Sequence, residues 1–193
     1  MPNLTIIIGS TRPGRAGAAI AQWFAARAKD HGGFDVTVVD LAEVGLPLLD
    51  EPNHPRLRQY TRQHTKDWSA VIDAADAFVF ITPEYNHGYS AALKNAIDYL
   101  HHEWLHKPVG FVSYGGVAAG TRAMQQLKQV VTALRMLPVY DSVNIPFHVQ
   151  LLDSDGVLGP NEVMDKAADT MLDELVRTEA SLRPLRPAPE PVA

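Results

Sequence analysis

Cysteine is absent from the 193 residues of the chain. Its absence excludes disulfide bonds, thiolate sites for zinc or iron–sulfur clusters, and catalysis by a cysteine nucleophile. Any redox chemistry must therefore come from a bound cofactor. The sequence also has no run of about 18 or more apolar residues, the length that a membrane-spanning helix needs, and no basic, apolar start typical of a secretion signal. We therefore expect a cytoplasmic protein that does not cross a membrane.

An excess of positive charge is also lacking. The chain has 17 Lys and Arg residues against 22 Asp and Glu residues, a net charge of −5. Nucleic acids and anionic lipids are bound by basic surfaces, so we expect neither a nucleic acid nor a membrane as a partner. Hydrophobic residues make up 46% of the chain, which is ordinary for a folded protein, and the length fits a single domain.

Short apolar runs alternate with helical stretches along the chain. Five runs are predicted to be strands: residues 4–8, 34–39, 77–81, 108–113 and 136–140. Apolar residues at helical spacing predict a helix after the first strand and others over residues 90–102, 119–134 and 160–181. Strands that are apolar throughout are typical of a parallel sheet covered on both sides. The pattern predicts an α/β fold, a doubly wound sheet of five parallel strands with helices on both faces.

Two segments interrupt this alternation. Residues 46–66 contain three prolines and a polar, basic run, and we expect them to form a long excursion over the surface. Residues 183–193 contain four prolines, and we expect an unstructured tail there. The folded domain is therefore predicted to span residues 1–182.

The first predicted strand ends in the loop GSTRPGRAG, residues 9–17, which leads directly into a helix. Its glycines let the backbone curl, Ser10 and Thr11 offer hydroxyl groups, and Arg12 and Arg15 offer positive charge. Two arginines at a helix start oppose the helix dipole unless an anion is bound there. The loop is thus predicted to hold an anion, the alternative being an ordinary turn with solvated arginines.

Known phosphate-binding motifs narrow the choice of anion. The loop has the G-x4-G spacing of a P-loop, but Arg15 and Ala16 stand where Lys and Ser or Thr are required. It also lacks G-x-G-x-x-G, because its glycines are Gly9, Gly14 and Gly17. A terminal monophosphate, with about two negative charges, fits better than a nucleoside triphosphate or a dinucleotide.

The loops after two further strands are suited to a flat ligand. Residues 82–90, TPEYNHGYS, can present backbone groups to the edge of a planar ring while Tyr85 packs nearby. Residues 113–120, SYGGVAAG, let the backbone approach such a ring. Each loop alone could be an ordinary turn, with Tyr85 and Tyr114 as surface packing. Ligands of parallel sheets bind at the carboxyl ends of strands, so three such loops together predict one binding site.

These motifs resemble those of the NADPH-dependent FMN reductases, flavodoxin-like flavoproteins that include quinone, chromate and azo-dye reductases. The resemblance runs from Leu4 to about Leu182 and includes, in family order, the loop at 9–15, PEYN at 83–86 with LKNAID at 93–98, and SYGG at 113–116. It implies that the FMN phosphate is held by Ser10, Arg12, Gly14, Arg15, Ala16 and Gly17. It implies that the isoalloxazine ring is lined by Pro83, Glu84, Tyr85 and Asn86 on one side and by Ser113, Gly115 and Gly116 on the other. Some members have Ser, Phe and Asn at positions 15–17.

The resemblance also implies a reaction that needs no catalytic side chain. Hydride would pass from NADPH or NADH to FMN, and electrons would then pass to a small acceptor such as a quinone, an azo dye, chromate or free flavin. Both substrates would use one pocket in turn, with ping-pong kinetics, and Tyr85 and Asn86 would lie near the ring. A homodimer or homotetramer is implied as well.

Other functions stay open at this point. One is a flavodoxin-like electron carrier without a nicotinamide site, and another is a non-catalytic module that shares the fold. A third is a zinc hydrolase, because His102, Glu103 and His106 match H-E-x-x-H. That motif lies at the end of its predicted helix, just before Pro108, where helical geometry is disfavoured. Trp104 is either part of the core or part of a subunit contact.

Overall fold

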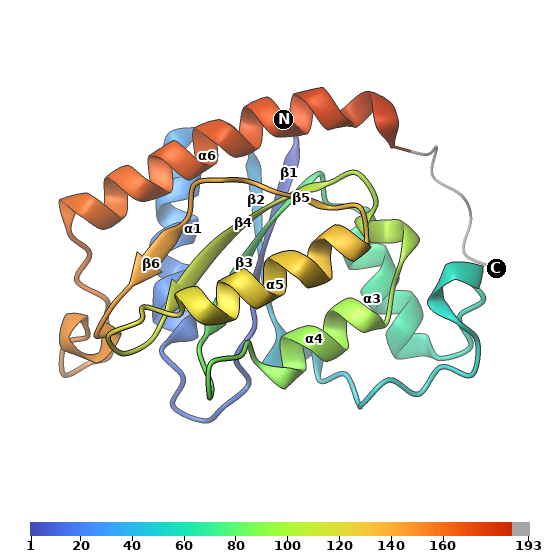
Figure 1. The fold of residues 1–193 in the computed structure, drawn as a ribbon, viewed down its shortest axis with the longest axis horizontal. Coiled ribbons are helices and arrows are strands. Elements are labelled where there is room, and N and C mark those ends of the chain that lie inside the picture. The colour runs from blue at the N-terminus through green and yellow to red at the C-terminus, as the bar shows by residue number, and fades with distance from the viewer. Residues whose placement is uncertain (187–193) are drawn as a thin grey trace.

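The computed structural model describes residues 1–186, and its centre is a parallel sheet of six strands (Figure 1). The strands are β1 (Asn3–Ile8), β2 (Asp35–Asp40), β3 (Ala77–Pro83), β4 (Pro108–Tyr114), β5 (Leu137–Pro138) and β6 (Val143–Ile145). Their order is β2-β1-β3-β4-β5, with β6 also paired to β4, and every pairing is parallel. The order reverses between β1 and β3, as the predicted doubly wound fold requires.

Helices cover both faces of this sheet. They are α1 (Gly17–His31), α2 (Leu41–Val44), α3 (Gln63–Asp73), α4 (Ala91–Asp98), α5 (Thr121–Ala133) and α6 (Glu162–Leu182), with short 3-10 helices η1 (Pro55–Leu57), η2 (His102–Trp104), η3 (His148–Leu151) and η4 (Arg183–Leu185). Helices α1 and α6 pack on one face, and α3, α4 and α5 pack on the other (Figure 1). Within the described residues, no helix is both long and apolar enough to cross a membrane.

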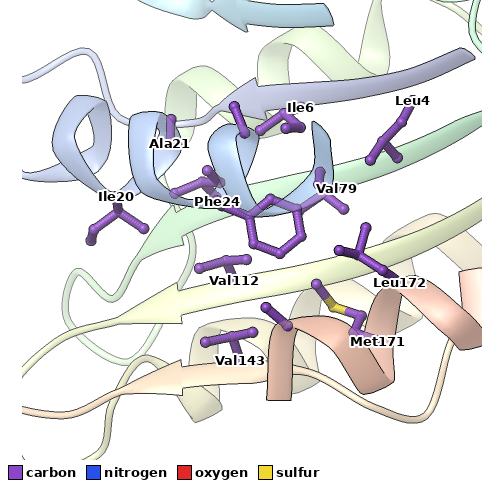
Figure 2. Packing of buried hydrophobic residues seen from close by; sticks show 14 of the residues in the cluster. Leu4, Ile6, Ile20, Ala21, Phe24, Val79, Val112, Val143, Met171 and Leu172 are labelled. Carbon is purple, nitrogen blue, oxygen red and sulfur yellow. The ribbon is translucent and has the colours of Figure 1, made fainter. Parts of the chain in front are cut away.

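The core lies on both sides of β3 and β4, which are buried at every residue. Side chains along a strand alternate between the two faces, so Val79 points toward α1 and α6 while Phe78 and Phe80 point toward the opposite helices. Figure 2 shows Phe24 of α1 and Leu172 of α6 in the first of these two clusters, close to Val79. This two-sided burial explains why the central strands read as continuous apolar runs.

The edge of the sheet next to β4 differs from the prediction, which was one strand over residues 136–140. Two short strands, β5 and β6, pair with β4 in its place. Between them, the backbone N–H groups of Tyr140 and Asp141 donate to the Glu174 carboxylate of α6, at 3.0 and 2.9 Å. The carboxylate thus replaces the neighbouring strand as hydrogen-bond acceptor and interrupts the edge strand.

The segment expected as an excursion over residues 46–66 is partly helical. It contains η1, and α3 starts within it at Gln63. Helix α3 was not predicted, although Trp68 and Ile72 on it are fully buried. The part before η1 is fastened to α4 by Asn95, whose side chain donates to Pro47 O at 2.7 Å and accepts from Leu49 N at 2.9 Å.

The first residues of the predicted unstructured tail, 183–186, are folded. Residues 183–185 form η4, which continues directly from α6. The Arg186 guanidinium pairs with Asp76 at 2.6 Å and with Glu179 at 3.0 Å. Residues 183–186 therefore belong to the folded chain, because Arg186 is held by Asp76, which precedes β3, and by Glu179 of α6. The rest of the predicted tail, residues 187–193, lies outside the described residues.

Lys107, which directly precedes β4, is a buried cation. We expect it to make the free energy of unfolding depend on pH. Its Nζ donates to the carbonyls of Ile72 and Asp73 at the end of α3, at 2.9 and 3.1 Å. Burial lowers the pKa of Lys107 from 10.5 to about 8. Between these two values the unfolded chain holds a proton that the folded chain has lost, so raising the pH favours folding.

The free energy of unfolding of the wild type, measured relative to that of Lys107→Met, is therefore expected to rise between about pH 8 and pH 10.5. The rise is at most about 1.4 kcal/mol per pH unit. Urea denaturation across this range measures the difference. Lys166→Met, which changes an exposed lysine of α6, is the control and should follow the wild type. Parallel pH profiles for the wild type and Lys107→Met would show that Lys107 does not titrate in this range.

Candidate active site

Three loops meet at the carboxyl edge of the sheet and enclose one pocket. They follow β1, β3 and β4. His148, which comes after β6, completes the pocket. The pocket is lined by Arg12, Arg15, Ala16, Pro83, Glu84, Tyr85, Tyr114, Gly115 and His148. The structure thus brings residues from all three predicted loops together, and it adds Tyr114 and His148, which the sequence did not assign to a site.

The loop after β1 places positive charge at the start of α1. Ala16 precedes the helix without a side-chain cap on its first N–H groups, and unpaired N–H groups at a helix start favour an anion. Arg15 forms an ion pair with Asp40 at the end of β2, and its Nε is buried with no hydrogen-bond partner in the described residues. Arg12 is exposed, and Gly14 adopts a positive φ of 68° that lets the loop turn.

The loop after β3 is a tight two-residue turn. Tyr85 and Gly88 exchange two backbone hydrogen bonds, of 2.8 and 2.9 Å. Asn86 and His87 between them both have positive φ, 50° and 70°, as a type I′ turn requires. The Tyr85 hydroxyl reaches back to the loop after β1 and forms a 2.7 Å hydrogen bond with the buried Ser10 Oγ. This bond fixes the two loops relative to each other.

The same turn is anchored to α5. Arg122 forms an ion pair with the Glu84 carboxylate and donates from Nη1 to His87 Nε2 at 2.9 Å. Gln126, one helical turn further, donates to His87 O at 3.0 Å. Since the guanidinium can only donate, His87 Nε2 must accept, which requires the neutral imidazole with its proton on Nδ1.

The loop after β4 is held in shape from inside. Ser113 is fully buried, and its Oγ lies 2.8 Å from both Ala119 O and Asn144 Oδ1. Gly120 has a φ of 79°, and a Cβ there would lie 2.7 Å from Tyr114 N, so only glycine fits. Ser113 is predicted to contact a cofactor, and in the structure its hydroxyl fixes the loop that carries Gly115 and Gly116.

His148 supports the same loop from the side of β6. Its Nδ1 lies 3.0 Å from Gly115 O, so Nδ1 is the protonated nitrogen that donates to this carbonyl. Its ring packs edge-on against the Tyr114 ring, with centroids 5.0 Å apart. No sequence pattern marked His148, because it follows a three-residue strand and contacts the pocket only through folding.

The H-E-x-x-H match does not have the geometry that a zinc hydrolase needs. His102 and Glu103 lie in the 3-10 helix η2, and His106 lies outside it with a positive φ of 56°. Glu103 is fully buried and accepts hydrogen bonds from Tyr60 Oη at 3.0 Å and Ser69 Oγ at 2.6 Å. The two histidines are therefore not one α-helical turn apart. Across residues 1–186, no group of three His, Cys, Asp or Glu side chains could hold a metal ion.

Trp104, which lies inside this motif, belongs to the core. It is fully buried, its ring packs 4.9 Å from the ring of Phe78, and its Nε1 donates to Ile97 O at 3.1 Å. Trp104 is therefore part of the core and not of a subunit contact.

The strand order and the position of the pocket define the class of protein. A parallel sheet in the order 2-1-3-4-5, with a ligand site where the order reverses, is the flavodoxin-like arrangement. Solved structures agree on the fold: FerB from Paracoccus denitrificans, a flavoenzyme NAD(P)H:(acceptor) oxidoreductase, is 21% identical with a TM-score of 0.73 over 94% of this chain and 99% of its own. A flavodoxin from Streptococcus pneumoniae has a TM-score of 0.55 at 14% identity, over 91% of this chain and 98% of its own.

Sequence comparison gives the family. Residues 2–150 match the family described as NADPH-dependent FMN reductase. An NAD(P)H-dependent FMN reductase of Schizosaccharomyces pombe is 44% identical over 149 residues, covering 75% of this chain and 74% of the relative. An FMN-dependent NADPH-azoreductase of Staphylococcus haemolyticus is 30% identical over 151 residues, covering 78% and 77%. The chain therefore belongs to the NADPH-dependent FMN reductase family, whose members are oxidoreductases that use FMN and take electrons from NADPH or NADH.

Proposed function

We propose that this oxidoreductase transfers electrons from NADPH or NADH, through FMN, to a small acceptor such as a quinone, an azo dye, chromate or free flavin. The observation that carries the proposal is the pocket itself, which joins two arginines at a helix start to a tight turn and a glycine loop. We propose further that donor and acceptor use this pocket in turn, with ping-pong kinetics, because the three loops form one pocket.

The phosphate end of the pocket fits FMN. Arg12, Arg15 and the uncapped start of α1 supply positive charge and free N–H groups. Buried polar atoms without a partner are costly, and two of them, Arg15 Nε and Tyr114 Oη, lie on residues of this pocket. We assign phosphate binding to the residues that supply charge, hydroxyl and backbone N–H groups here: Ser10, Arg12, Gly14, Arg15, Ala16 and Gly17.

The ring end of the pocket is built from backbone and small residues. Pro83, Glu84, Tyr85 and Asn86 would line one side of the isoalloxazine ring. Ser113, Gly115 and Gly116 would line the other, and the Ser113 hydroxyl also holds its loop in place. Gly116 has nothing within 4 Å of where a Cβ would stand, so a flat ring can approach the backbone there. The Ser10–Tyr85 hydrogen bond orients the Tyr85 ring at the pocket's edge.

FMN, when bound, supplies the hydride and electron chemistry, and the protein supplies binding, orientation and electrostatics. Arg12 and Arg15 neutralise the phosphate, and Tyr85 and Gly115 shape the space beside the ring. Glu84 is held by Arg122, which keeps its charge paired and fixes the start of the turn.

The first test is the visible absorption spectrum of the purified protein after incubation with FMN and desalting. Retained flavin bands that bleach when NADPH or NADH is added without oxygen are the expected result. Retained flavin that does not bleach would favour the electron-carrier alternative. If no flavin is retained even from excess FMN, the assignment of the pocket is wrong.

We also propose that the chain forms a homodimer or homotetramer whose partner subunit covers the pocket. Large apolar side chains next to the pocket support this, since Val117, Phe147 and Val149 are 80%, 50% and 69% exposed and exposed apolar patches mark protein contacts. Light scattering should give a mass of two or four chains, and a monomeric mass would contradict the proposal. The cytoplasmic location stays a prediction from the sequence.

Removing the anchor of the turn is expected to weaken FMN binding moderately. In Arg122→Gln, Glu84 loses its ion pair and His87 loses its donor, so the turn is less well fixed. The Arg122 side chain is 47% exposed, and pairs this exposed are worth at most about 1 kcal/mol. The dissociation constant of FMN, measured by flavin fluorescence, is therefore expected to rise by up to about fivefold.

Two variants make this prediction specific. Arg122→Lys keeps the charge but cannot reach two partners with a fork of donors, so it should fall between the wild type and Arg122→Gln. Arg177→Gln, which changes an exposed arginine of α6, should bind FMN like the wild type. Equal affinity for the wild type and Arg122→Gln would show that the intact turn does not need its anchor.

A further inference from the structure

Tyr114, the last residue of β4, has a buried hydroxyl group without a hydrogen-bond partner in the described residues. The residue is only 4% exposed. A buried hydroxyl that forms no hydrogen bond costs free energy that a folded protein seldom gives up without a reason. A ligand acceptor that enters the pocket would remove this cost.

The hydroxyl lies at the start of α1. A Cβ added to Gly17, the first residue of that helix, would lie 3.0 Å from Tyr114 Oη. Tyr114 also lines the same pocket as Arg12 and Arg15. The phenol therefore lies where the helix N-terminus and two guanidinium groups already favour an anion.

The Tyr114 hydroxyl is a donor at neutral pH. Burial raises the pKa of this phenol, and the neighbouring Tyr85 raises it further, while Ser10, Arg12 and Arg15 oppose the shift without reversing it. A protonated phenol has one hydrogen to give, and no described residue accepts it in hydrogen-bonding geometry, since the nearby Ser10 hydroxyl is paired with Tyr85. Together with the partnerless Nε of Arg15, it makes a pair of buried donors in one pocket.

We propose that Tyr114 binds the phosphate of FMN through its hydroxyl group and thereby sets the preference of this protein for FMN over riboflavin, which lacks the phosphate. The inference rests on the proposed use of the pocket for FMN and names a residue that the loop motif after β1 does not contain. It also gives a reason for glycine at position 17, since any side chain there would press on the Tyr114 hydroxyl at 3.0 Å.

The test compares the affinities of Tyr114→Phe and the wild type for FMN and for riboflavin, by flavin fluorescence. Removing one hydrogen bond to a charged group is expected to raise the dissociation constant of FMN about tenfold or more and to leave that of riboflavin unchanged. Tyr140→Phe, which removes a hydroxyl from a tyrosine that is 85% exposed, is the matched control and should change neither.

Each other outcome is decisive. An unchanged FMN affinity, or an equal loss for both flavins, would overturn the role of Tyr114 in phosphate binding. If Tyr114→Phe does not fold, as judged by circular dichroism, Tyr114→Met serves in its place. Its flexible apolar side chain fills the space without a hydroxyl group, and the same loss specific to FMN is expected. A wild type that binds neither flavin would instead refute the proposed function, which keeps the two failures distinct.

Discussion

Replacing Arg12 and Arg15 together by glutamine is expected to weaken FMN binding by about 100-fold or more. Each arginine offers charge-assisted hydrogen bonds to a phosphate, and hydrogen bonds to charged groups are worth about 1.5–3 kcal/mol. Two of them correspond to at least about two factors of ten. Titration calorimetry or flavin fluorescence measures the change, and Arg177→Gln is the control for a lost exposed arginine.

The single variants separate charge from contact. Arg15→Gln leaves the Asp40 carboxylate, whose side chain is only 11% exposed, without its ion partner, so repulsion adds to the lost contact. Changing Asp40 to Asn in the same chain removes that repulsion and should restore part of the affinity. If the double variant Arg12→Gln/Arg15→Gln binds FMN as tightly as the wild type, the loop after β1 does not bind the phosphate.

Replacing Glu103 by alanine is expected to lower the free energy of unfolding by about 3–5 kcal/mol, the usual loss when one partner of a buried ion pair is removed. The carboxylate is fully buried and accepts from Tyr60, Ser69 and Arg58. Without it, these donors lose their acceptor and a cavity remains. Urea denaturation measures the loss, and Glu43→Ala, an exposed glutamate of α2, should change little.

The same variant separates structure from catalysis. The described residues that contact the Glu103 carboxylate lie outside the pocket, so folded Glu103→Ala is expected to keep the FMN affinity of the wild type. Glu103→Gln keeps the size of the side chain and should lose less stability. A stable Glu103→Ala protein would mean that the buried network contributes little to folding.

The central strands and the three loops could be predicted because their signals are local. A strand buried on both faces must be apolar at nearly every residue, as β3 and β4 are. A loop that binds an anion at a helix start needs glycines and donors within a few residues. Helix α3 was missed because it shows little apolar sequence beyond Trp68 and Ile72 and follows a proline-rich segment.

The remaining parts depend on contacts between distant residues. The edge strand is interrupted by Glu174, which lies on α6, more than thirty residues further along the chain. His148 reaches the pocket only because β6 pairs beside β4. Ser113 and Tyr114 are adjacent in one predicted motif, but side chains alternate between the two faces along β4. Tyr114 therefore lies with Val112 in the cluster that packs against α1, and Ser113 points away from that cluster. No spacing rule in the sequence reveals which of the two hydroxyls is left without a partner.

The interruption of the edge strand also bears on aggregation. Long, regular edge strands invite pairing with strands of other molecules, and short, broken ones discourage it. Here β5 has two residues and β6 has three, and Glu174 occupies the N–H groups of Tyr140 and Asp141 between them. A foreign strand would have to displace this carboxylate to extend the sheet beyond β5 and β6. One acidic side chain on α6 thus protects this edge of the sheet against growth into larger β-structures.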